Sequence, residues 1–186
     1  MANDPQDIRA WQRLSPEVTT SGRVEDKDVA RLAQIGTRHV INLALDDHPD
    51  ALAGEGDKLT AQGVAYTHIP VPFDAPQEAH YQAFVGALEA GETPVHVHCI
   101  ANWRVSAFFY RYHRERGMVE AEARALMERQ WSPETSTHPA GPAWAAFISG
   151  ENTASPNRHP GLDPGSRFLD RAKKTAGPRI ESGMTK

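Results

Sequence analysis

The chain has 186 residues, 39 % of them hydrophobic, with a net charge of −4 and a single cysteine. This length suits one domain with a buried core and is too short for two domains of ordinary size. The negative charge argues against general nucleic-acid binding, because proteins that bind the phosphate backbone usually carry a basic surface. One cysteine excludes an internal disulfide and a CxxC metal or redox motif.

Cysteine usage and the N-terminal sequence both point to the cytoplasm. Chains without disulfides are typical of reducing compartments. Residues 1–7 lack the basic start and the apolar core of a signal peptide, and no apolar run is long enough to span a bilayer. We therefore expect a cytoplasmic protein that does not enter the membrane.

Strand-like and helix-like apolar patterns alternate along the first part of the chain. The predicted strands are residues 14–22, a short edge strand closed by a turn, and then 39–44, 65–71 and 95–98. The predicted helices are residues 26–35, 51–62, 77–90, 104–116, 119–130 and 142–148. Strands joined by helix-length crossovers form a mostly parallel sheet with helices on both faces. The sequence therefore predicts an α/β domain over residues 1–150.

The composition changes after Gly150. Residues 151–186 contain four prolines, four glycines, seven basic and four acidic residues, so they carry a charge of +3 and leave −7 for residues 1–150. They show no periodic apolar face, and such a segment does not offset its own ordering entropy. Residues 159–167 and 177–185 resemble the translation of a palindromic interspersed repeat found in bacterial genomes. We therefore predict a disordered tail without a function of its own.

The stretch from Val95 to Ser106 holds the cysteine. Cys99 stands where a β-branched run ends and a helical pattern begins, with a histidine before it and Arg104 five positions after it. Sites in parallel sheets form at the carboxyl ends of the strands, and the free N–H groups of a helix N-terminus favour a thiolate and bind anions. The stretch is therefore a candidate site for an anion and a sulfur nucleophile. The alternative is a small buried hydrophobe followed by an ordinary helix arginine.

These residue types fit the hydrolysis of a phosphate monoester. The N–H groups of residues 100–104 would curl around three phosphate oxygens, and the planar guanidinium of Arg104 would hold two of them. The Cys99 thiolate would attack phosphorus in line and form a thiophosphate intermediate. The leaving alcohol then needs an acid that afterwards activates water. We assign this role to Asp74, in a loop that follows a strand expected to lie beside residues 95–98.

Other carboxylates also follow strands. Asp46 and Asp47 come after the predicted strand 39–44 and are the runner-up acids, with solvated turn residues as the alternative interpretation. For Asp74 the alternative is a helix-capping role before the next helix.

The run His98-Cys99-x4-Arg104 resembles the signature of the cysteine-dependent phosphatase superfamily, whose tyrosine and dual-specificity members have five residues between the cysteine and the arginine. The shorter loop occurs in a bacterial branch, the beta-lactamase-hydrolase-like phosphatase domain. The resemblance covers about residues 10–115 and includes Leu14-Ser15-Pro16 with Ser21-Gly22, Val40-Ile41-Asn42-Leu43, His68-Ile69-Pro70-Val71 and Pro94-Val95. It implies a phosphatase-like fold and hydrolysis of phosphotyrosine or a related phosphate monoester, in a phosphorylated protein or a small molecule.

The loop departs from the family pattern after the cysteine. Asn102 stands where related loops usually have glycine, and asparagine is among the few residues that tolerate a positive φ. Val105 replaces a serine or threonine whose hydroxyl stabilises the departing thiolate, so we expect Ser106 either to take over that role imperfectly or to face the helix. Trp103 either walls the pocket for an aromatic substrate or packs. The predicted substrate-binding residues are Ile100, Ala101, Asn102, Trp103, Arg104 and Ser106.

Two other functions fit the same loop. Rhodanese-type sulfurtransferases also use a Cys-x4-Arg loop on an α/β fold, and there Cys99 would carry a persulfide. A phosphate-binding module with little catalysis, a pseudophosphatase, would fit the missing hydroxyl after Arg104.

Two histidines lie on one side of the strand 95–98. His96 and His98 without a third ligand make a weak metal site. We expect His96 to be buried and hydrogen-bonded, and His98 to bond the loop backbone and orient the cysteine. The sequence has no Walker loop, dinucleotide fingerprint or HExxH motif. We therefore expect neither a metal nor another cofactor.

Overall fold

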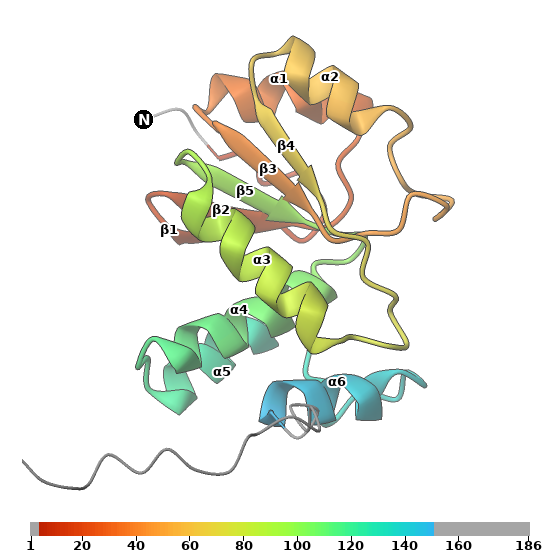
Figure 1. The fold of residues 1–186 in the computed structure, drawn as a ribbon, viewed down its shortest axis with the longest axis vertical. Coiled ribbons are helices and arrows are strands. Elements are labelled where there is room, and N and C mark those ends of the chain that lie inside the picture. Colours follow the sequence, from red (N-terminus) through yellow and green to blue (C-terminus); the bar gives the residue numbers. More distant parts are fainter. Residues whose placement is uncertain (1–3, 151–186) are drawn as a thin grey trace, which may run out of the picture. The chain divides into compact units, whose positions relative to one another are not determined.

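The computed structural model describes residues 4–150 (Figure 1), so the predicted tail lies outside the described residues and its boundary stays a prediction. The strands of this range are β1 (Gln12–Ser15), β2 (Val18–Ser21), β3 (His39–Asn42), β4 (Ala65–His68) and β5 (Val95–His98). The helices are α1 (Asp26–Gln34), α2 (Glu55–Ala61), α3 (Glu78–Ala90), α4 (Trp103–Glu115), α5 (Glu120–Glu128) and α6 (Gly141–Ser149).

The strands form one sheet in the order β1-β2-β5-β3-β4. Only the β1–β2 pair is antiparallel, and β2, β5, β3 and β4 run parallel to one another. The predicted mostly parallel sheet is therefore confirmed. Its central strand is β5, whose valines alternate with histidines and whose four residues are all buried.

The predicted edge strand 14–22 is wrong, because two strands occupy this stretch. Pro16 has no backbone N–H to donate to a ladder, and the Glu17 N–H donates to the Ser15 Oγ at 3.2 Å, so the chain reverses there. β1 becomes the edge of the sheet, and β2 lies inside it against β5.

The strand before the Asp74 loop also has a different neighbour from the one predicted. β4 pairs with β3, and β3 separates it from β5. The β3–α2–β4 unit places its two strands side by side, whereas the α3 crossover carries the chain back over β3. Strand order of this kind depends on long-range packing and leaves no trace in local periodicity.

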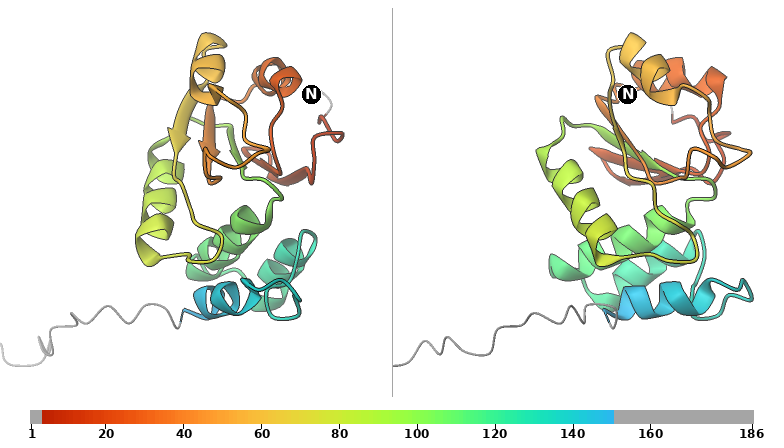
Figure 2. Two further views of the ribbon diagram at one scale, coloured as in Figure 1. Left: turned by 90° about the vertical axis from the view of Figure 1, so that its right-hand side faces the viewer. Right: turned by 45° about the vertical axis from the view of Figure 1, so that its right-hand side comes forward.

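Helices cover both faces of the sheet, as predicted (Figures 1 and 2). Because neighbouring residues of a strand point to opposite faces, Val40 and Ile41 of β3 belong to two separate apolar clusters. The cluster of Val40 includes residues of α1 and α2, and the cluster of Ile41 includes residues of α3, α4, α5 and α6.

Most predicted helix limits agree with the structure to within two residues. The exception is the predicted helix 51–62, which begins only at Glu55 because Gly54 takes a left-handed conformation with φ +67°. Among residues 4–150, no helix combines the length and the apolar character needed to cross a membrane.

Candidate active site

The cysteine loop, residues 99–104, joins β5 to α4 (Figure 1). It leaves the carboxyl edge of the sheet at its middle, since β5 lies between β2 and β3. Cys99 is fully buried, and its N–H donates to the Ser21 carbonyl of β2 at 3.4 Å. The predicted position of the cysteine, at the carboxyl end of a strand and just before a helix, is confirmed.

Asn102 makes the turn that the loop needs. Its φ is +64°, and a positive φ is what we expected at a position where related loops usually have glycine. The Nδ2 group donates to the Ala10 carbonyl at 2.8 Å and to Thr20 Oγ1 at 3.0 Å. The side chain therefore ties the loop to β2 and to the segment before β1. Directly after it, α4 begins, and the first N–H groups of a helix have no partner within the helix.

Gly22, just after β2, permits a close approach to the loop. A Cβ atom at this position would lie 2.8 Å from the Ile100 carbonyl oxygen. The next residue, Arg23, donates its N–H to the same oxygen at 3.0 Å. The Ser21-Gly22 pair thus allows the end of β2 to contact the cysteine loop.

Arg104 lies in the first turn of α4 and is only 6 % exposed. Its Nε donates to the Val71 carbonyl at 2.8 Å, and its Cζ lies 5.0 Å from the centroid of the Phe73 ring. Within residues 4–150 no hydrogen bond occupies its two Nη groups, which are the pair that forms a fork for an oxyanion. The guanidinium is therefore fixed along one edge and available along the other.

Asp74 belongs to the same loop as the partners of Arg104. The loop between β4 and α3 carries Val71, Phe73 and the exposed Asp74. Although β4 is not next to β5, the two contacts with Arg104 bring this loop to the cysteine loop. Asp74 thus directly follows a residue that packs on Arg104.

The runner-up acids lie in the turn after β3, which does pair with β5. Both Asp46 and Asp47 are exposed. Asp46 Oδ2 lies 3.4 Å from His68 Nδ1, with 79 % of its side chain exposed. This environment is that of a solvated turn residue paired at the surface.

Trp103 packs within an aromatic cluster beside the cysteine loop. Its ring stacks on Trp131 with centroids 4.8 Å apart and planes 5° apart. Phe73 lies 5.9 Å from it, and His138 contacts Phe73 edge-on at 5.0 Å. Phe73 and Trp103 are half-buried and His138 is exposed, so these three form what we call the aromatic wall. The packing role predicted for Trp103 is confirmed, and the three residues of the wall keep part of their surface exposed.

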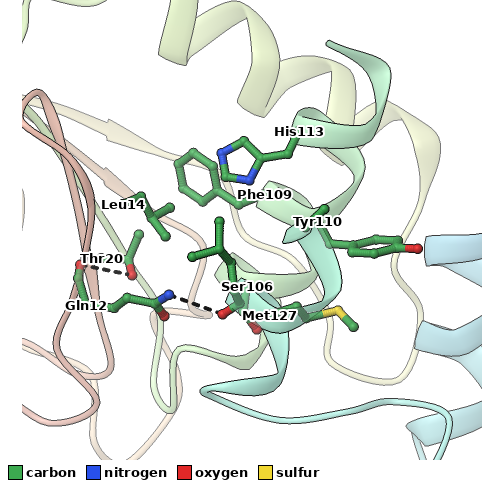
Figure 3. A pocket seen from close by; sticks show the side chains of 10 residues that line it. Gln12, Leu14, Thr20, Ser106, Phe109, Tyr110, His113 and Met127 are labelled. Carbon is green, nitrogen blue, oxygen red and sulfur yellow. Dashed lines mark hydrogen bonds between the residues drawn. The ribbon is translucent and has the colours of Figure 1, made fainter. Parts of the chain in front are cut away.

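Of the two roles predicted for Ser106, stabilising the thiolate or facing the helix, the structure shows the second. Its hydroxyl donates to the Trp103 carbonyl at 2.9 Å, within α4. The residue lines a small cavity between the β1–β2 hairpin and helices α4 and α5, together with Gln12 and Thr20 (Figure 3). Val105, which stands where related loops have a hydroxyl, is fully buried.

His96 is buried and hydrogen-bonded, as predicted. Thr19 Oγ1 lies 2.9 Å from its Nδ1, and Ser21 Oγ lies 2.9 Å from its Nε2. Complete burial, with a smaller contribution from neighbouring His98, holds the pKa of His96 well below its usual range. His96 is therefore a neutral structural side chain. Residues 4–150 bring together no group of three metal-ligating side chains.

His98 has a partner that the sequence did not reveal. Its Nε2 lies 2.7 Å from Glu55 Oε1 of α2, rather than on the loop backbone. The contact is an ion-pair distance in which the N–H is not aligned well enough to count as a hydrogen bond. A lone glutamate in a short amphipathic helix gives no signal of such a contact, which only the tertiary structure creates.

Residues 8–110 match one protein family, described as beta-lactamase hydrolase-like protein, phosphatase-like domain. The chain belongs to this family. The matched range begins before β1 and ends within α4, so it contains the whole sheet and the cysteine loop. The description names the same phosphatase-like branch that the spacing of Cys99 and Arg104 led us to expect.

Solved structures agree with this assignment. A DUF442 phosphatase candidate from Shewanella putrefaciens CN-32 is 32 % identical, with a TM-score of 0.65, covering 78 % of this chain and 92 % of that one. TpbA from P. aeruginosa is 22 % identical, with a TM-score of 0.60 and coverage of 84 % and 96 %. PTPMT1 is 18 % identical, with a TM-score of 0.58 and coverage of 79 % and 99 %. The last two show a shared fold. A search of curated proteins found no match.

Proposed function

We propose that this protein hydrolyses phosphate monoesters through a covalent intermediate on Cys99. The observation that carries the proposal is the position of Arg104 and Cys99 at the two ends of one tight loop. Arg104 is held by Val71 and Phe73 with its Nη groups unoccupied by residues 4–150, and Cys99 directly follows the central strand β5. The family match supports phosphatase chemistry for this loop.

The loop binds the phosphate before any bond changes. Free N–H groups at the start of α4 and in residues 100–104 donate to the phosphate oxygens, and Arg104 supplies two further donors and a permanent positive charge. The left-handed conformation of Asn102 lets the backbone turn tightly, as a loop whose successive N–H groups share one anion requires. Of the predicted substrate-binding residues, Ile100, Ala101 and Trp103 contribute their backbone N–H groups.

The reaction then takes two balanced steps. The Cys99 thiolate attacks phosphorus, an S–P bond forms, and the P–O bond to the alcohol breaks while Asp74 gives its proton to the departing oxygen. In the second step, the Asp74 carboxylate takes a proton from water, whose oxygen attacks phosphorus. The S–P bond breaks, and inorganic phosphate and the thiolate are released. Ser106 and Val105 offer no free hydroxyl to the leaving thiolate, so the second step is the slower one.

The aromatic wall favours an aryl phosphate as substrate. Phe73 lies against Arg104 and is in ring contact with Trp103 and His138, and aromatic pairs gain about 0.5–1.5 kcal/mol beyond the area that they bury. A cysteine-to-serine variant of TpbA, a protein that shares the fold, has been crystallised in complex with pTyr. We propose phosphotyrosine or a small aryl phosphate for this protein as well.

A direct assay separates the proposed function from its two rivals. We expect the wild-type chain to hydrolyse p-nitrophenyl phosphate and Cys99→Ser to lose at least about a thousandfold of this turnover, because no other nucleophile occupies the loop. Transfer of sulfur from thiosulfate to cyanide without phosphate release would instead identify a sulfurtransferase. Phosphate binding without turnover, equal in Cys99→Ser, would identify a binding module.

A further inference from the structure

A buried carboxylate lies beneath the cysteine loop, on the face of the sheet that α1 and α2 cover. Glu55 is the first residue of α2, and 4 % of its side chain is exposed. Removing a carboxylate from water is unfavourable unless donors surround it. The groups in contact with the two carboxylate oxygens of Glu55 therefore indicate what stabilises its charge in the interior.

One oxygen of Glu55 is used by two neutral donors. Oε2 accepts a hydrogen bond from Asn42 Nδ2 at 2.9 Å and lies 3.5 Å from the hydroxyl of Tyr66. Burial, and then the charge of Glu55, raises the pKa of Tyr66, so this hydroxyl stays protonated and can donate. Asn42 lies opposite His98 in the β3–β5 ladder. These contacts fix the carboxylate over the end of β5.

The other oxygen faces the residue before the nucleophile. Oε1 lies 2.7 Å from His98 Nε2, and His98 is itself 3 % exposed. The nearest titratable ring to His98 on β5 is His96, at 6.1 Å, and it is neutral with both ring nitrogens held by hydroxyls. Among residues 4–150, neither ring nitrogen of His98 has a partner aligned for a hydrogen bond. The carboxylate of Glu55, 2.7 Å from Nε2, is the described charged group in contact with this ring.

We propose that Glu55 is a positioning residue of the active site, which holds the proton of His98 on Nε2 and so fixes the ring and the end of β5 from which Cys99 emerges. The proposal rests on the proposed function only for its kinetic readout. An acceptor at Nε2 selects the ring nitrogen that carries the proton, and a fixed ring holds the backbone of its neighbour. A nucleophile displaced by a fraction of an ångström attacks poorly, even where its substrate still binds.

The kinetic test compares two acidic residues of α2. Glu55→Gln keeps the size of the side chain and removes its charge, and Asp57→Asn makes the same change at an exposed position of the same helix. With p-nitrophenyl phosphate, we expect Glu55→Gln to lower kcat about tenfold, because Cys99 must be held in line both when it attacks and when it departs in the slower second step. KM stays within about twofold, because Arg104 and the loop still bind phosphate. Asp57→Asn keeps wild-type values. Equal kcat for both variants would overturn the proposal.

A second comparison tests whether Glu55 acts through His98. In a His98→Gln background, Glu55→Gln is expected to lower kcat no further, because the contact is already lost. A full additional tenfold loss in that background would show that Glu55 acts independently, which contradicts the proposal. Thermal unfolding of each variant separates loss of fold from loss of rate.

Two further measurements need no phosphatase activity. In the wild-type chain labelled with ¹⁵N-histidine, the ring signals of His98, assigned by their absence in His98→Gln, are expected to show a proton on Nε2. The rate of Cys99 alkylation by iodoacetamide is expected to fall at least about threefold in Glu55→Gln and to stay constant in Asp57→Asn. An unprotonated Nε2 or unchanged alkylation would refute the inference. A Glu55-dependent alkylation rate in a chain without turnover would refute the proposed function alone.

Discussion

Asn102 occupies a position where backbone conformation and side-chain bonding act together. A left-handed φ of +64° costs an ordinary residue about 1–2 kcal/mol, and the side chain adds two hydrogen bonds that hold the loop to Ala10 and Thr20. Glycine at this position would satisfy the backbone and lose the bonds. Alanine would satisfy neither.

This difference gives a stability prediction. Asn102→Gly is expected to lower the free energy of unfolding by about 1 kcal/mol through the lost hydrogen bonds, and Asn102→Ala by about 1–2 kcal/mol more through backbone strain. Urea unfolding followed by circular dichroism measures both values. If alanine and glycine destabilise equally, strain at residue 102 does not contribute.

The role of Asp74 can be tested by changing the leaving group. Asp74→Asn is expected to lower kcat/KM, which reports the first step, about a hundredfold for an alkyl phosphate, whose oxygen must be protonated as it departs, and only slightly for p-nitrophenyl phosphate. The matched variants Asp46→Asn and Asp47→Asn keep wild-type rates on both substrates. A hundredfold loss in either of these variants, with an active Asp74→Asn, would move the acid to the turn after β3.

At the scale of elements, the aromatic wall joins three segments that are distant in sequence. The β4–α3 loop supplies Phe73, α4 supplies Trp103, and the segment between α5 and α6 supplies His138. Trp131 stacks on Trp103, and Trp144 Nε1 donates to the Phe73 carbonyl at 2.6 Å. Helix α6 and the segment between α5 and α6 thereby stabilise one side of the candidate active site.

His138 is the residue of the aromatic wall that can be substituted with the least disturbance of the fold, because it is exposed. Its loss is expected to leave Phe73 and Trp103 in place. We expect His138→Ala to raise KM for aryl phosphates about threefold to tenfold, the equivalent of one aromatic contact, and to leave alkyl phosphates unchanged. Thr137→Ala, at an exposed neighbouring position, is the control. An equal change in KM for both substrate classes would show that the wall does not select aryl groups.

Local patterns predicted the elements better than their arrangement. The β-branched run ending at Cys99 and the helical spacing of Val105, Phe108, Phe109 and Tyr112 are sufficient to place β5, α4 and the cysteine loop between them. The position of β4 beside β3, and the contact between Glu55 and His98, arise from packing between segments that no local pattern connects. The hairpin at Pro16 was missed because a run of short polar residues looked continuous.

For the whole molecule, buried histidines couple stability to pH. Burial lowers the pKa of His39 and holds the pKa of His96 well below its usual range. The unfolded chain therefore binds more protons than the folded chain as pH falls below about 6.5, the ordinary value for histidine. Stability is fully present above that pH and is lost below it.

Each such histidine contributes a slope of at most about 1.4 kcal/mol per pH unit to the free energy of unfolding. We expect urea unfolding to show a decline in this free energy from pH 6.5 toward pH 5, and His96→Gln to reduce the steepness of the decline. A free energy of unfolding that stays constant over this interval would contradict the neutral, buried state of His96.

The central claim is that phosphate passes through Cys99. Acid quenching of the wild-type chain during turnover of p-nitrophenyl phosphate, followed by mass spectrometry of the peptide that contains Cys99, tests it most directly. The account predicts one phosphoryl group on Cys99 in the wild type, more of it in Asp74→Asn where water is not activated, and none in Cys99→Ser. Steady turnover with an unmodified Cys99, or turnover retained in Cys99→Ser, would contradict it.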